Sequence, residues 1–250
     1  MTLAAHLQEA RTRLLRCAVG VMVGVVAGYL LHEQIFELLR APITALAESR
    51  DAALNYDSVT GAFELTMKVS LFAGIVFSSP VWLSQAFAFF VPGLTPRERR
   101  YTLGFLAAAV PLFAAGCVTG FTLFPHIVEL LASFASADDS TFLLASTYVD
   151  FVVKLVVACG IAFVLPVFTV LLNLLGMLPG RTIVRSWRVI LVAVVLFSAI
   201  ATPAADIVSM FLLAVPLTGL FAASALFAVL HDRRVERRLE RRLAATDPLH

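Results

Sequence analysis

Long uncharged apolar segments alternate with short polar segments along the whole chain. About 20 helical residues cross the hydrocarbon core of a bilayer. Lipid offers no hydrogen-bond partners, so the backbone of such a segment must pair internally, as it does in a helix. The pattern predicts an all-α polytopic membrane protein with six transmembrane helices, at about residues 14–31, 66–91, 101–128, 150–178, 188–203 and 207–230.

Composition agrees with this prediction and excludes an ordinary soluble domain. Apolar residues make up 60% of the chain, charged residues make up 14%, and the mean hydropathy is +0.91. Charged residues account for about a quarter of a typical soluble domain. We therefore interpret residues 1–230 as one membrane domain and residues 231–250 as a charged cytoplasmic tail.

Arginines gather on one side of the predicted topology. An even number of spans places both termini on the same side, together with the loops around Arg97 and Arg185. Only Arg40 and Arg50 fall on the opposite side. Because cytoplasmic loops are enriched in Lys and Arg, we expect a protein of the cytoplasmic (inner) membrane with both termini in the cytoplasm.

Prolines interrupt several of the predicted spans. Pro80, Pro111 and Pro166 should each remove a helix hydrogen bond and bend the helix, which predicts a concave, kinked bundle. The fifth span is short, because the apolar run Val189–Ala201 gives only about 20 Å at 1.5 Å per residue. That length predicts local thinning of the bilayer.

The segment between the first two spans is predicted to form an ordered outer cap. Residues 33–40 have an amphipathic pattern, and the helix should end before Pro42 because the residue preceding proline disfavours the α conformation. Apolar residues later in the segment can pack over the spans.

The second and fourth spans share a sequence pattern at an offset of 86 residues. Both a duplication and a chance similarity between apolar segments are compatible with it. The shared positions include Lys68, Gly74 and Pro80 in the first copy and Lys154, Gly160 and Pro166 in the second.

Lys68 and Lys154 are the only lysines of the chain, and each follows an acid, Glu64 or Asp150, by four residues. This spacing allows each lysine to be neutralised by the acid on its own helix. Ionisable residues inside a membrane also mark functional sites. A paired lysine site near the outer face would support an alternative function, a small-solute carrier built on the repeat.

Two basic segments on the predicted cytoplasmic side each contain one carboxylate. Glu98 lies among three arginines in a loop broken by prolines, and Glu9 lies among arginines in the amphipathic N-terminal segment, residues 1–16. We interpret the positive partner of Glu98 as the arginines of another protein. Glu9 stands four residues before Arg13, and the two can pair on one exposed helix for about a few tenths of a kcal/mol. For residues 1–16, a solvated face that anchors the chain is the alternative.

Motifs for other chemistry are missing from the sequence. It contains no Gly-rich phosphate loop, no metal-ligand cluster and no nucleophile–base motif. Three cysteines fall inside the predicted spans without metal spacing, and we interpret them as buried apolar side chains. We therefore expect no enzyme, no cofactor, no metal site and no nucleic-acid partner.

Six motifs occur in an order that identifies a family. They are His6-Leu7-x-Glu9-x-Arg11-x-Arg13, Pro80 in its span, Phe89-x2-Pro92-Gly93-Leu94-x3-Glu98-Arg99, Phe124-Pro125, Phe163-x2-Pro166 and Thr202-Pro203-x2-Asp206. In these motifs the chain resembles TatC, the six-span core subunit of the twin-arginine (Sec-independent) protein translocase, up to about residue 230.

The resemblance implies a receptor that binds twin-arginine signal peptides of folded proteins at its cytoplasmic face. It implies proton-motive-force-driven export in assembly with TatA- and TatB-like single-span membrane proteins, self-association, and contact with membrane lipid. Val164 stands where the family often has a glutamate, so an intramembrane acid is missing. The implied signal-binding residues are Glu9, Glu98, Arg11, Arg13, Phe89, Pro92 and Arg99. The implied structural or functional residues in the membrane region are Pro42, Phe63, Lys68, Pro80, Lys154, Pro166 and Asp206.

Overall fold

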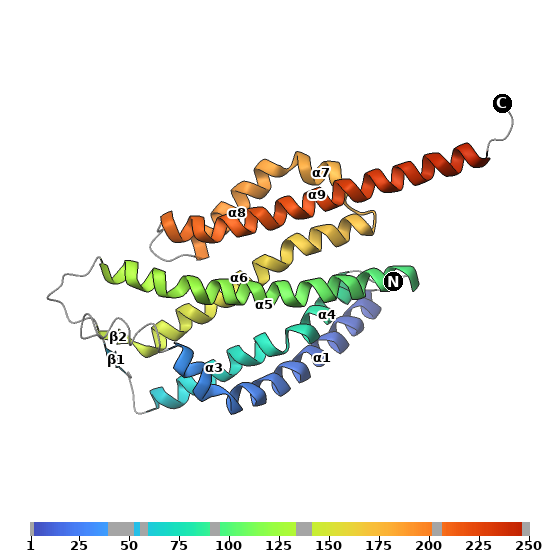
Figure 1. The fold of residues 1–250 in the computed structure, drawn as a ribbon. Helices are drawn as coiled ribbons and strands as arrows, with labels where there is room; N and C mark the ends of the chain where they lie inside the picture. The colour runs from blue at the N-terminus through green and yellow to red at the C-terminus, as the bar shows by residue number, and fades with distance from the viewer. Residues whose placement is uncertain are drawn as a thin grey trace.

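The fold is helical, as predicted, with one small pair of strands (Figure 1). The computed structural model describes residues 3–39, 53–55, 60–90, 96–133, 142–201 and 207–246. A further short helix covers residues 32–39. The labelled elements are α1 (Leu3–Leu30), β1 (Ala53–Asn55), α3 (Gly61–Phe77), α4 (Ser79–Phe90), α5 (Pro96–Ser133), β2 (Phe142–Leu144), α6 (Ala145–Leu174), α7 (Gly180–Arg185), α8 (Trp187–Ala201) and α9 (Ile207–Thr246).

Helix covers most of the described residues of each predicted span, although not every helix has the length of a full span. Four helices of the described chain are long and apolar enough to cross a membrane, and a fifth results if α3 and α4 are counted as one broken span. α8 has 15 residues and is shorter than a full span, as its short apolar run predicted. The count of six spans and the orientation of the termini stay predictions.

The predicted bend at Pro80 is confirmed. α3 and α4 meet at 58°, with Ser78 between them. Pro80 is the second residue of α4, where its missing N–H is tolerated because the first turn of a helix has no partners for its donors. Pro111 and Pro166 lie inside continuous helices, and bending at these two residues stays a prediction.

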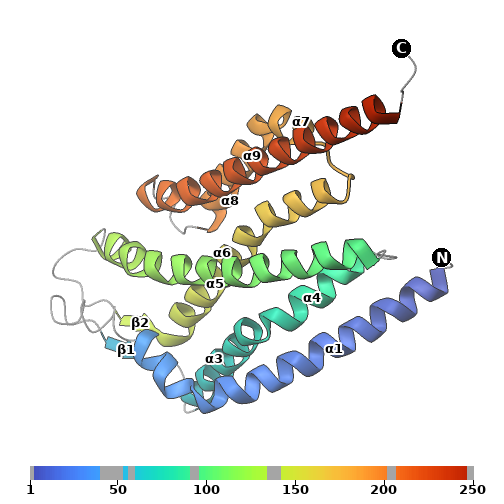
Figure 2. The ribbon, with the colours of Figure 1, turned by 45° about the vertical axis from the view of Figure 1, so that its right-hand side comes forward.

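The helices form two groups joined by α6 (Figures 1 and 2). α1, α3 and α4 lie on one side of α5, and α7, α8 and α9 lie on the other. α6 packs extensively on α5 and also contacts α3, α8 and α9. Phe113 and Phe124 of α5 are fully buried in the core, as are Val152 and Leu155 of α6.

Glycines permit the closest helix crossings. A Cβ atom on Gly24 of α1 would lie 2.5 Å from the carbonyl oxygen of Gly74 in α3. A Cβ atom on Gly116 of α5 would lie 2.6 Å from the carbonyl oxygen of Cys159 and 2.8 Å from Cα of Gly160, both in α6. Gly74 and Gly160 are equivalent positions of the predicted repeat, so the shared pattern marks two similar close crossings between successive spans.

Part of the predicted outer cap lies at the end of the molecule away from the termini. β1 and β2 pair in parallel there, with Leu54 opposite Leu143. The Tyr148 hydroxyl donates a hydrogen bond of 2.7 Å to the Leu39 carbonyl, and its ring packs edge-on against Phe124. These contacts tie the helix of residues 32–39 to α6. Whether that helix ends before Pro42 stays a prediction, because residues 40–52 and 56–59 lie outside the described residues.

Candidate functional site

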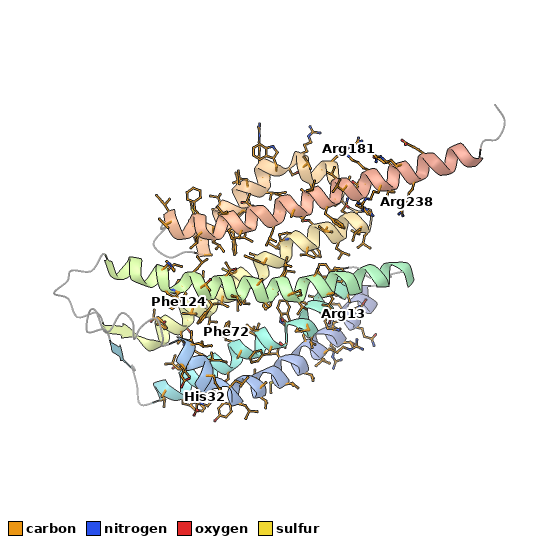
Figure 3. The ribbon with its side chains drawn as sticks, viewed as in Figure 1. Arg13, His32, Phe72, Phe124, Arg181 and Arg238 are labelled. Atoms are coloured by element: carbon orange, nitrogen blue, oxygen red, sulfur yellow. The ribbon has the colours of Figure 1, made fainter. Side chains whose placement is uncertain are left out.

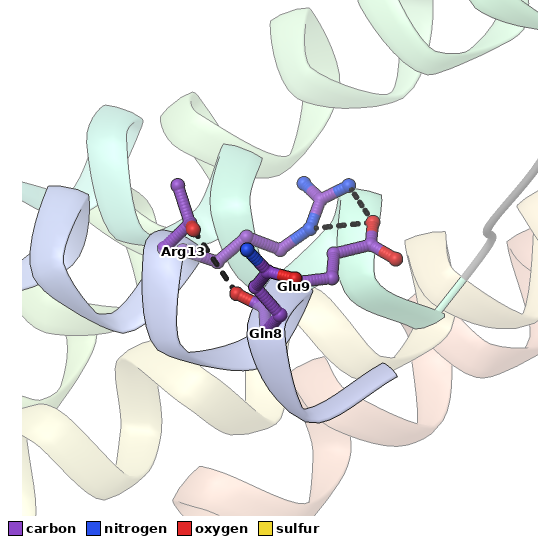
Figure 4. Close-up of polar contacts among 4 residues, drawn as sticks. Gln8, Glu9 and Arg13 are labelled. Atoms are coloured by element: carbon purple, nitrogen blue, oxygen red, sulfur yellow. Dashed lines mark hydrogen bonds and ion pairs between the residues drawn. The ribbon is translucent and has the colours of Figure 1, made fainter. Parts of the chain in front are cut away.

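Glu9 and Arg13 form an ion pair one turn apart on α1 (Figure 4). Nη2 and Nε of Arg13 lie 2.5 and 3.0 Å from the same Glu9 oxygen, Oε1. The side chains are 26% exposed for Glu9 and 21% exposed for Arg13. The carboxylate therefore already holds one guanidinium, supplied by the protein itself, and Arg11 next to the pair is exposed.

The pair lies next to the end of α4. α1 packs against α3 and α4, and Figure 4 shows Glu9 and Arg13 beside the α4 ribbon. Phe89, a predicted signal-binding residue, is partly buried one residue before the end of α4. The structure thus brings Glu9 and Phe89 to the same end of the molecule.

Glu98 lies in the first turn of α5, which begins at Pro96. A carboxylate at such a position is favoured by the helix dipole. This end of α5 lies at the same end of the molecule as the start of α1 (Figures 1 and 2). The side chains of Glu98 and Arg99 lie outside the described residues, as do Pro42, Pro92 and Asp206 altogether.

An apolar pocket of about 590 Å³ lies between α5, α6 and α9. Ser224 is the one polar side chain among its lining residues, and its hydroxyl donates to the Phe221 carbonyl at 2.8 Å. The pocket lies near the start of α5 and the end of α6, toward the end of the molecule that carries Glu9. Its walls are Gly104, Phe105, Ala108 and Leu112 of α5, Pro166, Val167, Val170, Leu171 and Leu174 of α6, and Leu220, Ala223, Ser224 and Phe227 of α9.

Lys68 pairs with two acids, one of them on another helix. Its Nζ lies 3.0 Å from Glu64 and 3.1 Å from Asp150 of α6. The expectation that Asp150 neutralises Lys154 on its own helix is therefore wrong, because the α3–α6 crossing brings Lys68 to that carboxylate. Lys154 is exposed and has no ion pair with the described residues. A paired lysine site for a carrier thus finds no support, since Lys68 is already neutralised.

We expect Lys68→Gln to lower the stability of the protein slightly. The three side chains are 33–57% exposed, and ion pairs with such exposure contribute up to about 1 kcal/mol. The thermal unfolding midpoint in detergent should therefore fall by a few degrees at most. Lys154→Gln is the matched control and should leave the midpoint unchanged. An equal loss in both variants would contradict a link between α3 and α6.

The other predicted positions are spread over the structure. Phe63 is 68% exposed in the first turn of α3, far from the Glu9 end. Pro166 is fully buried in α6 and lines the apolar pocket. Val164 is buried as well, so the apolar replacement of a glutamate lies inside the protein.

Sequence reasoning missed a polar cluster between α6, α7 and α9. The Asp232 carboxylate accepts hydrogen bonds from the Gly180 N–H at 2.6 Å and from the Asn173 amide at 2.9 Å. The same amide donates to the Leu178 carbonyl at 2.9 Å. The cluster fixes the start of the charged part of α9 to the loop before α7. An asparagine inside an apolar run was the available signal.

Gln85 of α4 was also missed. The oxygen of its amide is buried and accepts no hydrogen bond from the described residues. Gln85 precedes Phe89 by four residues, so the two share a face of α4. The amide oxygen of Gln85 is thus an unsatisfied polar atom about one helical turn before Phe89, which lies at the Glu9 end of α4.

Comparisons with known proteins agree on one family. The family model described as "TatC: Sec-independent protein translocase protein (TatC)" matches residues 5–216. The Sec-independent protein translocase protein TatC of Xylanimonas cellulosilytica is 42% identical over 240 residues, which is 95% of this chain and 87% of that protein. The corresponding protein of Rothia mucilaginosa is 35% identical and covers 99% of this chain and 85% of its own length.

A solved structure supports the same assignment. A crystal structure described as the twin arginine translocase receptor TatC superimposes with a TM-score of 0.72 at 28% identity. The match covers 90% of this chain and 98% of that one.

Proposed function

Because this chain belongs to the TatC family of Sec-independent protein translocase proteins, we propose that it binds twin-arginine signal peptides of folded proteins at the end that carries Glu9 and Glu98. The chain is a multi-pass membrane component of the twin-arginine translocase and a transport protein rather than an enzyme. The observation that carries the proposal is the Glu9 carboxylate, which already accepts a guanidinium group through two donors of Arg13.

The geometry of that pair suits arginine better than lysine. A guanidinium presents a planar fork of donors to a carboxylate, whereas an ammonium group is a point charge. An incoming arginine competes with Arg13 for Glu9, and ion pairs of similar exposure differ by less than about 1 kcal/mol. Glu9 therefore contributes selectivity, and most of the affinity comes from Glu98 and from apolar contacts at residues such as Phe89.

We also propose that this end of the molecule faces the cytoplasm. Arg13, Arg181 and Arg238 lie toward it, whereas His32 and Phe124 lie toward the other end (Figure 3). Cytoplasmic segments next to membrane spans are enriched in arginine. With this orientation both termini are cytoplasmic, and the receptor meets signal peptides before export.

The proposal extends to partners and to the membrane. Assembly with TatA- and TatB-like single-span proteins and with further copies of the chain follows from the family, and export is then driven by the proton-motive force. α8 offers one apolar surface for such contacts, because Val189, Val192 and Ile200 are each at least 65% exposed. At 15 residues, α8 also supports local thinning of the bilayer around it.

Site-specific crosslinking tests the proposal. A photoreactive amino acid at position 89 should crosslink to a signal peptide with Arg-Arg, and crosslinking should fall at least about tenfold with Lys-Lys, because the fork geometry is lost. The matched control places the photoreactive residue at position 63, which is exposed at the opposite end. Equal crosslinking of the two peptides at position 89, or equal crosslinking at both positions, would contradict the proposal. Co-purification with single-span proteins tests the assembly.

A further inference from the structure

The part of α9 beyond the predicted membrane span carries four exposed arginines on one side. They are Arg233, Arg234, Arg237 and Arg238, and no carboxylate of the described residues pairs with any of them. At 100° per residue these positions fall within less than half of the helix circumference. We call this side the arginine face.

Two acids of the same segment are turned toward α7 instead. Asp232 accepts the hydrogen bonds from Gly180 and Asn173, and Glu236 lies 3.7 Å from Arg181 of α7. A Cβ atom on Gly180 would lie 2.9 Å from the backbone of α9 at Ala228. α9 is therefore held in one rotation at this point, with Asp232 and Glu236 against α7 and the arginine face turned away.

The arginine face continues the wall of the apolar pocket. The pocket is lined on α9 by residues spaced as one helical stripe, which ends at Phe227. Arg234 and Arg238 follow Phe227 by seven and eleven residues, so they stand on the same side of the helix. At 1.5 Å per residue they lie about 10 and 17 Å farther along α9, beyond the apolar part of the helix. Figure 3 shows Arg238 on the part of α9 that projects past α6.

We propose that the pocket and the arginine face together bind an anionic phospholipid of the adjacent leaflet. An acyl chain occupies the apolar pocket, and the phosphate is bound by Arg234 and Arg238. Arginine binds phosphate oxygens through two parallel hydrogen bonds, and a basic cluster directly after a membrane span is typical of anionic-lipid recognition.

The sign of the charge selects this occupant over a signal peptide. A twin-arginine peptide is itself cationic and is repelled by the arginine face, whereas Glu9 lies on α1, which packs on α3 and α4. The lipid site therefore stands apart from the proposed receptor site. It also does not depend on which side of the membrane the termini occupy, because either leaflet contains headgroups at that depth.

Native mass spectrometry of the purified full chain in detergent tests the site. The probes are phosphatidylglycerol and phosphatidylcholine with identical oleoyl chains. The wild type should retain phosphatidylglycerol preferentially. The variant Arg234→Gln/Arg238→Gln should bind it about 10- to 30-fold more weakly, given the usual contribution of each arginine near a lipid surface, with phosphatidylcholine unchanged. The matched control, Arg185→Gln/Arg188→Gln, removes two exposed arginines at the same end, one at the end of α7 and one at the start of α8, and should behave as wild type.

A pocket variant separates the acyl-chain contact from the headgroup contact. Ala223→Phe should weaken retention of both lipids, because the ring fills the pocket. Equal retention of the two lipids by the wild type, or an equal loss in Arg185→Gln/Arg188→Gln, would overturn the proposal. If Ala223→Phe left lipid retention unchanged but reduced crosslinking of a twin-arginine signal, the pocket would belong to the signal peptide, and the acyl-chain assignment would be overturned.

Discussion

Replacing Glu98 by glutamine should weaken crosslinking of a twin-arginine signal peptide by about ten- to a hundred-fold, which corresponds to the usual contribution of a hydrogen bond to a charged group. Glutamine keeps the size of the side chain but removes the negative charge. The first turn of α5 places this residue at the same end of the molecule as Glu9. The incoming guanidinium therefore loses a negatively charged partner, while the shape of the site is kept.

Glu9→Gln should also weaken crosslinking of the signal peptide, but by a smaller factor than Glu98→Gln. In the wild type an arginine of the signal must displace Arg13 from Oε1 of Glu9, so the net gain at this carboxylate is small. Removing it therefore removes less binding free energy than removing the Glu98 charge. Under the proposed function each carboxylate binds one guanidinium. Replacing one arginine of the signal by lysine should therefore weaken crosslinking less than replacing both.

The matched control is Glu240→Gln. Glu240 is an exposed carboxylate on the distal part of α9, at the same end of the molecule, so this variant changes the net charge by the same amount. All three variants should insert into the membrane at wild-type levels. Wild-type crosslinking in Glu98→Gln, or an equal loss in Glu240→Gln, would show that general electrostatics and not these acids recruits the signal.

The helices and their breaks follow from local physics, so the sequence predicted them well. A long apolar run must pair its own backbone in lipid. Pro80 lacks a backbone N–H, so the helix is interrupted close to it. The Glu9–Arg13 pair also follows from one-turn spacing and is confirmed. The assignment of the signal-peptide site to Glu9 and Glu98 stays a prediction, and the side chain of Glu98 lies outside the described residues.

Contacts between helices depend on crossing geometry, which the sequence does not contain. The i to i+4 rule pairs Asp150 with Lys154, yet the α3–α6 crossing gives the carboxylate to Lys68. Acids interleaved with arginines, as in the tail of α9, are typical of a solvated charged helix. The separation of Asp232 and Glu236 from the arginine face depends on the hydrogen bond from Gly180 to Asp232, which fixes the rotation of the helix.

The second large effect is expected at the α5–α6 crossing, where Gly116→Ala should destabilise the protein by about 1–3 kcal/mol, the usual range for overpacking. The new Cβ atom would lie 2.6 Å from the Cys159 carbonyl oxygen and 2.8 Å from Cα of Gly160. Both are backbone atoms, so no side-chain rotation relieves the contact and the two helices must separate. The thermal unfolding midpoint of the purified protein in detergent measures the loss.

Gly219→Ala is the control that isolates the crossing from the general effect of removing a helical glycine. Gly219 also lies inside a long helix, α9, but a Cβ atom there would meet nothing within 4 Å. Alanine is a better helix former than glycine by about 0.8–1 kcal/mol, so this variant should keep or raise the unfolding midpoint. Opposite signs for the two glycines follow only if helix contact, and not backbone flexibility, is what Gly116 provides. A midpoint that rises in both variants would contradict this close approach of α5 and α6. It would also contradict the packing of the two helices that line the pocket.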